Sequence, residues 1–136
     1  MRIVLDTNVL VSAIFWGGTP GLLIKQWLAE RVELVASVEI IAEYERVLHE
    51  VAATRGRADL AQRWVNLIAE HITLVDVSTK VKLCRDPDDD KYIDCAIQGG
   101  AAFLVSGDKD LLSLGTAGNT PIVTAKQVLA VLTKGH

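Results

Sequence analysis

The chain opens with an apolar run that ends abruptly at a carboxylate, and this feature constrains its fold more than any other. The apolar residues 3–5 are followed directly by Asp6 and then by Thr7 and Asn8. Consecutive apolar positions predict a strand that is buried on both faces, as in a parallel sheet covered by helices. Because ligands gather beyond the carboxyl ends of parallel strands, Asp6 is a candidate functional residue. The alternative is that Asp6 or Thr7 caps a helix that begins near Asn8.

The same pattern returns late in the chain, where the apolar run 102–106 is followed by Gly107 and Asp108. Further strands are expected at 33–36, 72–77 and 121–123, and segments with helical periodicity are expected at 9–16, 19–31, 38–51, 58–71, 90–98 and 125–132. Strands that alternate with helices predict a single α/β domain over residues 1–136, with a mostly parallel central sheet of four to five strands flanked by helices. In such a sheet Asp6 and Asp108 lie at equivalent strand ends and face each other across the crevice.

Composition narrows the class of protein. A chain of 136 residues with 50% hydrophobic and 23% charged residues is expected to fold around a proper core. Its formal net charge of -3 argues against the broad basic surface of a constitutive nucleic-acid binder. No signal-peptide pattern and no apolar run of roughly 18 to 20 residues is visible, so a cytoplasmic location without membrane contact is expected. The two cysteines are not spaced like zinc ligands.

A second group of acids lies in the helix expected to begin at residue 90. Asp90 and Asp94 are four residues apart, on one side of that helix, and like charges at this spacing repel each other. Lys91 or Lys109 could offset the repulsion, but Mg²⁺ or Mn²⁺ is the stronger candidate because these cations prefer oxygen ligands. Two such ions roughly 3.5 to 4 Å apart could activate a water and stabilise the leaving oxygen in phosphodiester hydrolysis.

Each acid also has a purely structural interpretation. Asp88 and Asp89 are interpreted as a helix cap and a solvated neighbour, and Asp110 as a surface residue. Glu43 belongs to a charged stripe that is typical of a solvated helix face. Asp90 could be a first-turn residue that interacts favourably with the helix dipole.

Four segments, taken in order, cover most of the chain and resemble the PIN-domain ribonucleases, including VapC-like toxins. They are IVLDTNVL at 3–10, SxExxxExxxVL at 37–48, DPDDDK at 86–91 and LVSGDKDLL at 104–112. PIN domains are small α/β proteins whose acidic cluster binds Mg²⁺ or Mn²⁺ and cleaves RNA. Many bacterial and archaeal members are toxins of toxin-antitoxin pairs and are often dimeric. The resemblance therefore implies a metal-dependent endoribonuclease with an RNA substrate, an antitoxin partner and a homodimeric state.

Carried over by position, the resemblance implies a set of catalytic and metal-binding acids. They are Asp6, Glu43, Asp90 and Asp108. The interpretation of Glu43 thereby changes from a solvated residue to a residue that helps to hold the metal or orients the attacking water. Asp94 is a further candidate, at a position where many family members carry a small residue. Asn8 and Ser106 would hold ligands and waters in place, with Ser106 standing where the family often has threonine.

Contacts to the RNA backbone would come from basic residues around the crevice. The candidates are Arg46, Arg55, Arg57, Arg85, Lys91 and Lys109. Substitution of a true phosphate contact should lower the salt dependence of RNA binding.

Three rival functions stay open. A phospho-receiver module would begin with adjacent acids after its first strand, whereas Asp6 stands alone. A catalytically silent pseudo-nuclease would act by binding a partner, although all four expected acids are present. A DNA substrate, as in related 5′-nucleases, would be distinguished by testing RNA and DNA side by side.

Overall fold

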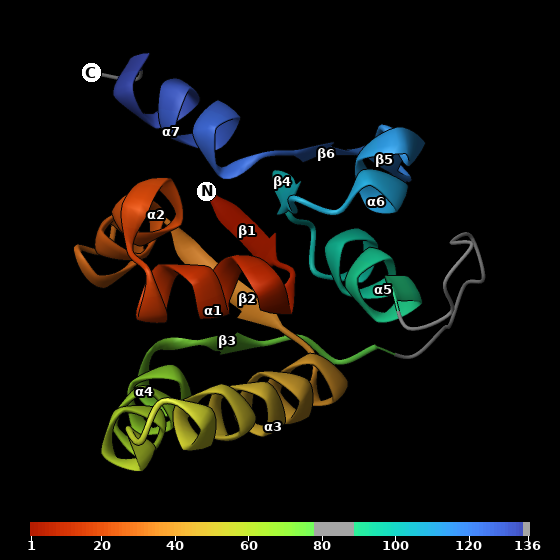
Figure 1. Ribbon diagram of the computed structural model, residues 1–136. Helices are drawn as coiled ribbons and strands as arrows, with labels where there is room; N and C mark the ends of the chain where they lie inside the picture. Colours follow the sequence, from red (N-terminus) through yellow and green to blue (C-terminus); the bar gives the residue numbers. More distant parts are fainter. Residues whose placement is uncertain (78–88, 135–136) are drawn as a thin grey trace.

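The computed structural model describes residues 1–77 and 89–134 and has the alternating strand and helix order that the sequence predicts (Figure 1). The strands are β1 (Arg2–Leu5), β2 (Glu33–Ala36), β3 (Thr73–Leu74), β4 (Phe103–Val105), β5 (Thr116–Ala117) and β6 (Thr120–Val123). The helices are α1 (Thr7–Phe15), α2 (Gly18–Leu28), α3 (Val38–Thr54), α4 (Ala58–His71), α5 (Asp90–Gln98), α6 (Lys109–Leu114) and α7 (Ala125–Lys134). The expected α/β class with a mostly parallel sheet is confirmed.

The central sheet has the strand order β3-β2-β1-β4-β6-β5, and all its neighbours are parallel except β5 and β6. It has six strands where four to five were expected, because the two-residue strand β5 returns along β6 as a hairpin too short to leave a periodic signal. β1 pairs with β4 so that Leu5 lies beside Val105. This register sets Asp6 beside Ser106 at the carboxyl edge of the sheet.

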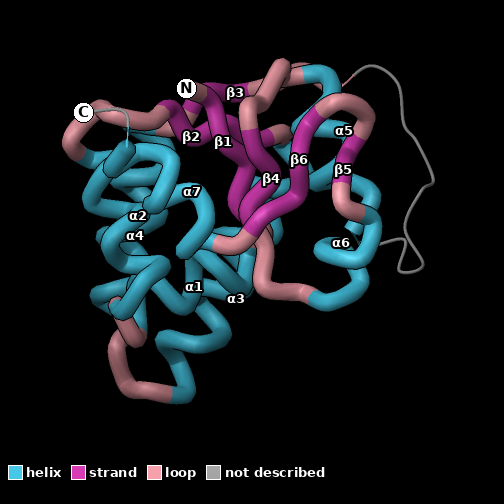
Figure 2. The backbone as a smooth tube through the Cα atoms, turned by 90° about the horizontal axis from the view of Figure 1, so that it is seen from above, coloured by secondary structure: helices cyan, strands magenta, loops and turns pink. Residues whose placement is uncertain are grey.

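Helices cover the strands on both sides. Figure 2 shows α1, α2, α3, α4 and α7 on one side of the strands and α5 on the other. Burial on two sides explains the unbroken apolar run of β1, where Ile3, Val4 and Leu5 are at most 1% exposed. No single helix in the described ranges has the length and hydropathy of a membrane span, and α1 with α2 reaches them only as a pair bent by 95°.

Two boundaries differ from the expectation. Residues 52–57 were expected to form a loop, but α3 continues to Thr54 because Ala52 is fully buried and packs as helix. The helix then ends in a Schellman motif, in which the N–H of Arg57 donates to the carbonyl of Ala52 and Gly56 takes a positive φ of 64°. The strand expected at 72–77 is confined to β3, although Val75 N–H still donates to the carbonyl of Ala36.

Candidate active site

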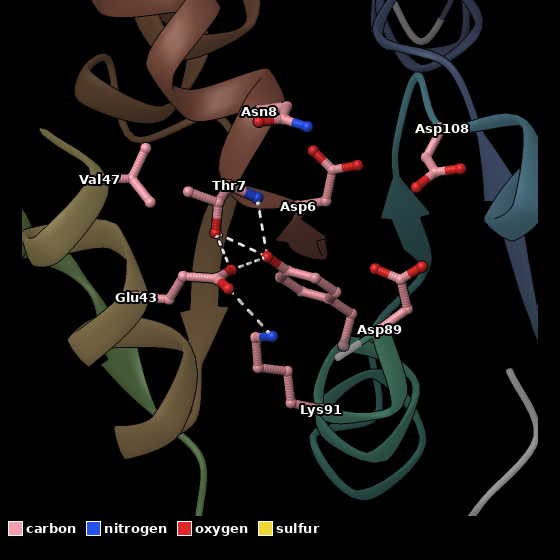
Figure 3. Close-up of a pocket in the computed structure, with 9 residues that line it drawn as sticks. Asp6, Thr7, Asn8, Glu43, Val47, Asp89, Lys91 and Asp108 are labelled. Carbon is pink, nitrogen blue, oxygen red and sulfur yellow. Dashed lines mark hydrogen bonds and ion pairs between the residues drawn. The ribbon is translucent and has the colours of Figure 1, made fainter. Parts of the chain in front are cut away.

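A polar pocket of about 210 Å³ lies at the carboxyl edge of the sheet (Figure 3). Its lining residues come from the β1–α1 junction, α3, the start of α5 and the turn between β4 and α6: Asp6, Thr7, Asn8, Glu43, Val47, Asp89, Lys91, Tyr92 and Asp108. The prediction that Asp6 and Asp108 face the same crevice is confirmed. Asn8 and Glu43, two further predicted site residues, line it as well.

Asp6 caps α1, as one of the two interpretations offered by the sequence expected, and it also lines the pocket, while its functional role stays a prediction. Its Oδ1 accepts a hydrogen bond of 2.9 Å from the N–H of Val9 at the start of α1, and its Oδ2 accepts one from the hydroxyl of Ser106. The residue is only 4% exposed. Burial raises the pKa of Asp6, and the nearby charge of Asp108 raises it further, while the bonds from Ser106 and Val9 oppose the shift.

Asp108 is the counterpart of Asp6 after β4. Its Oδ1 caps α6 by accepting a hydrogen bond of 2.8 Å from Asp110 N–H, and its own N–H donates to the Ser106 hydroxyl at 2.9 Å. Ser106 therefore links both strand-end acids, while its expected role in holding ligands and waters stays a prediction. Within the described part of the chain, Asp108 Oδ2 has no hydrogen-bond donor.

Glu43 projects from α3 into a set of protein donors. Its Oε2 accepts hydrogen bonds from the hydroxyls of Thr7 and Tyr92, and its Oε1 lies 3.1 Å from Lys91 Nζ. The Tyr92 hydroxyl also accepts a hydrogen bond of 3.1 Å from the N–H of Thr7. Partial burial raises the pKa of Glu43, but the bonds from Thr7, Tyr92 and Lys91 outweigh it and bring the pKa below its ordinary value.

Thr7 and Tyr92 were not among the predicted site residues. Thr7 follows Asp6 directly, which is the signal that could have identified it. Tyr92 lies at a position with the periodicity of core residues, and it is indeed only 4% exposed. Periodicity predicts that its ring is buried but does not predict that its hydroxyl reaches the pocket. Burial raises the pKa of Tyr92 well above its ordinary value, and the charge it faces on Glu43 adds to the shift. The hydroxyl is therefore a stable donor.

The acids at the start of α5 are arranged differently from the expectation. Asp89 occupies the N-cap position, but its side chain makes no capping hydrogen bond and lines the pocket instead. Asp88, its expected partner as cap, lies outside the described residues. Asp90 and the buried Asp94 belong to α5 and are not among the described residues that line the pocket. Their roles as ligands stay predictions.

The basic candidates divide into two groups. Lys91 lines the pocket, Lys109 follows Asp108 at the start of α6, and Arg46 lies 3.8 Å from Glu43. Arg55 and Arg57 lie beyond the far end of α3.

Arg55 stacks over the exposed Trp16 ring at 4.9 Å, and Arg57 pairs with Asp59 at 3.3 Å. A rise of about 1.5 Å per residue sets Arg55 on the order of 18 Å from Glu43 along α3. Arg85 lies outside the described residues. Contact of any of these six residues with RNA stays a prediction.

The donor set fits a hard divalent cation. Asp6, Asp89 and Asp108 direct carboxylates toward one side of the pocket (Figure 3). Over residues 1–77 and 89–134, no three Asp, Glu, His or Cys side chains converge closely enough to form a complete metal-binding cluster. Mg²⁺ commonly binds through one or two carboxylates and keeps several waters, so a complete protein cage is not required.

Comparison with known proteins agrees with this architecture. The family model described as the PIN domain matches residues 2–110. The uncharacterized protein MJ1680 of Methanocaldococcus jannaschii is 27% identical over 117 residues, which cover 84% of this chain and 75% of that protein.

Solved structures share the fold at low sequence identity. VapBC2 from Rickettsia felis, bound to a DNA fragment from their promoter, has a TM-score of 0.61 and 16% identity, covering 90% of this chain and 97% of that chain. FitAcB from Neisseria gonorrhoeae has a TM-score of 0.60 and 17% identity, covering 91% and 98%. PAE2754 from Pyrobaculum aerophilum has a TM-score of 0.60 and 17% identity, covering 98% and 89%.

Proposed function

This chain belongs to the PIN domain family, and from that premise we propose that it is a metal-dependent endoribonuclease. The observation that carries the proposal is the pocket at the carboxyl edge of the sheet, which Asp6, Asp89 and Asp108 all line. Carboxylates collected from three separate segments have no packing purpose in common, and they repel one another unless a cation is present. Burial raises the pKa of Asp6, and the charge of Asp108 adds to the shift.

The pocket residues have distinct tasks in the proposed hydrolysis. Mg²⁺ or Mn²⁺, when bound, supplies Lewis acidity and lowers the pKa of a water. Asp6 and Asp108 would hold the cation. The Ser106 hydroxyl donates to the Asp6 carboxylate and accepts from the backbone N–H of Asp108, so it fixes the one side chain and the backbone of the other. Asp89 supplies the third carboxylate in place of Asp90, because only Asp89 of this pair lines the pocket. A water would attack the scissile phosphorus as the bond to the leaving oxygen breaks; the water gives up a proton to solvent, and the leaving oxygen takes one up from solvent.

RNA is the substrate that the resemblance to PIN-domain ribonucleases favours. The first test is cleavage of a structured RNA, with DNA of the same sequence in parallel, by the purified chain with Mn²⁺ or Mg²⁺. Asp6→Asn, prepared identically, controls for contaminating nucleases, and Asp59→Asn removes an exposed acid from α4 as a matched control.

We expect RNA cleavage that requires the metal, disappears in Asp6→Asn and survives in Asp59→Asn. Loss of one good electrostatic group typically costs about 10²-fold or more in rate. Equal cleavage by the chain and Asp6→Asn would contradict the proposal. Cleavage of DNA alone would move the function to the rival 5′-nuclease class.

The partner is also part of the proposal. The resemblance to VapC-like toxins and the structural likeness to a VapBC2 complex support a toxin that a cognate antitoxin binds. Expression of the chain without a partner should arrest growth of a bacterial host, and Asp6→Asn should not. Growth arrest by both variants would indicate a cause other than the acidic pocket. The homodimer is tested by sedimentation, where a mass near twice that of the chain is expected.

A further inference from the structure

Lys91 places an ammonium group inside the acidic pocket. Its side chain is only 10% exposed, and Nζ lies 3.1 Å from Glu43 Oε1 and 4.9 Å from the centroid of the Tyr92 ring. A lysine at the surface keeps its ammonium in water, whereas this one is held between a carboxylate and an aromatic face. Lys91 is therefore a fixed cation of the site.

The Glu43 carboxylate has protein partners at both of its oxygens. A carboxylate oxygen has two acceptor positions, and both positions on Oε2 are occupied by the hydroxyls of Thr7 and Tyr92. Oε1 faces Lys91 and has Arg46 at 3.8 Å. Glu43 is thus surrounded by protein donors and has little left to offer a metal.

The pocket is divided by charge. Figure 3 shows Glu43 facing Lys91 on one side, while Asp6, Asp89 and Asp108 lie on the other. A fixed ammonium beside Glu43 repels a divalent cation there, and it supplies the neutralising charge that such a cation would bring. Only the side with the three aspartates is left for a metal.

We propose that Lys91 takes the place of a second metal ion, so that the pocket binds one divalent cation on the side of Asp6 and Asp108. Lys91 is then a positioning residue that fixes Glu43, and Glu43 is not a metal ligand. The inference rests on the proposed metal-dependent function and deepens it. It replaces the pair of ions that the acidic residues alone suggested.

The test counts bound Mn²⁺ per chain by equilibrium dialysis with electron paramagnetic resonance of the free ion. The variants are Lys91→Met, Lys91→Arg and Glu43→Gln, with Lys25→Met as a matched control because Lys25 is an exposed lysine of α2 outside the pocket lining. Thermal unfolding checks that each variant is folded.

We expect one Mn²⁺ in the unmodified chain, Lys25→Met and Lys91→Arg, and two in Lys91→Met. Glu43→Gln should keep one Mn²⁺ with its affinity changed by less than about threefold, since loss of an outer partner of a true ligand typically costs about 10-fold or more. Two ions in the unmodified chain, or one in a folded Lys91→Met, would overturn the inference. So would an affinity loss of about 10-fold or more in Glu43→Gln.

The same Mn²⁺ measurement distinguishes failure of the proposed nuclease function from failure of the proposal about Lys91. If the unmodified chain binds no Mn²⁺ at millimolar concentration, the proposed metal-dependent hydrolysis is wrong as well. If it binds two ions and still cleaves RNA, only the role of Lys91 is wrong.

Discussion

At the scale of single residues, the buried carboxylate of Asp6 has a cost in the folding free energy of the metal-free protein. Asp6 is 4% exposed and faces the charge of Asp108, so its ionised form is disfavoured in the folded chain. Caps and the Ser106 hydroxyl recover part of that cost. A residue selected for packing alone would carry no charge here, which is why the cost points to function.

Asp6→Asn should therefore stabilise the metal-free chain at neutral pH. Because the pKa of Asp6 is raised in the folded state, the ionised carboxylate destabilises folding above that pKa, and the effect vanishes as pH falls below the ordinary value of 3.8. We expect a gain in the free energy of unfolding at pH 7, because asparagine carries no charge that burial disfavours. The gain should shrink as the pH is lowered towards 3.

Chemical denaturation of both proteins over this pH range, without metal, measures the effect. Asparagine keeps an oxygen that can accept from Val9, so the cap itself is retained. A less stable Asp6→Asn at pH 7, or a difference that does not change with pH, would contradict this description of Asp6.

The hydrogen bonds of the Tyr92 hydroxyl lead to a separate prediction. It accepts the hydrogen bond from the buried N–H of Thr7 and donates to Glu43. Tyr92→Phe leaves that N–H without its acceptor, and a buried unsatisfied group costs about 1 to 3 kcal/mol. Urea denaturation should show a loss of this size. Unchanged stability would mean that the hydroxyl network does not fix Glu43.

At the scale of elements, the strand ends and the start of α5 at Asp90 were predictable, but the aspartate near that start that lines the pocket was not. The runs 3–5 and 102–106 end at the same edge of a parallel sheet, so Asp6, Ser106 and Asp108 could be brought together from sequence alone. The run of aspartates at 88–90 predicts the helix start, but it does not show which of these side chains faces the pocket. Neighbouring residues at the start of a helix point in different directions. Asp89, at the N-cap, lines the pocket, whereas Asp90, the first residue of α5, does not.

The phase of α5 can be tested with two neighbouring variants. Asp89→Asn should weaken Mn²⁺ binding and RNA cleavage by about 10-fold or more, because it removes a carboxylate from the pocket. Asp90→Asn changes the same charge one position away and should have a smaller effect on both. Metal binding by calorimetry and cleavage rates compare them directly. A larger loss in Asp90→Asn would restore the sequence-based assignment.

At the scale of the whole molecule, the α/β architecture followed from the alternation of elements, but the contacts of Glu43 did not. Glu43 meets Thr7 and Tyr92 across 36 and 49 residues of sequence, and Thr7 meets Tyr92 across 85. Such contacts depend on how α1, α3 and α5 pack around the end of β1, which hydrophobic periodicity does not specify. The family resemblance implied a functional role for Glu43, and the fold shows which residues hold its side chain.

The most direct test of the central claim is anomalous X-ray diffraction at the manganese edge from crystals of the chain grown with Mn²⁺. We predict an anomalous peak in the pocket, bound to carboxylate oxygens of Asp6 and Asp108. No peak in this pocket at millimolar Mn²⁺, with the pocket open to solvent in the crystal, would contradict the claim that these acids form a metal-dependent nuclease centre.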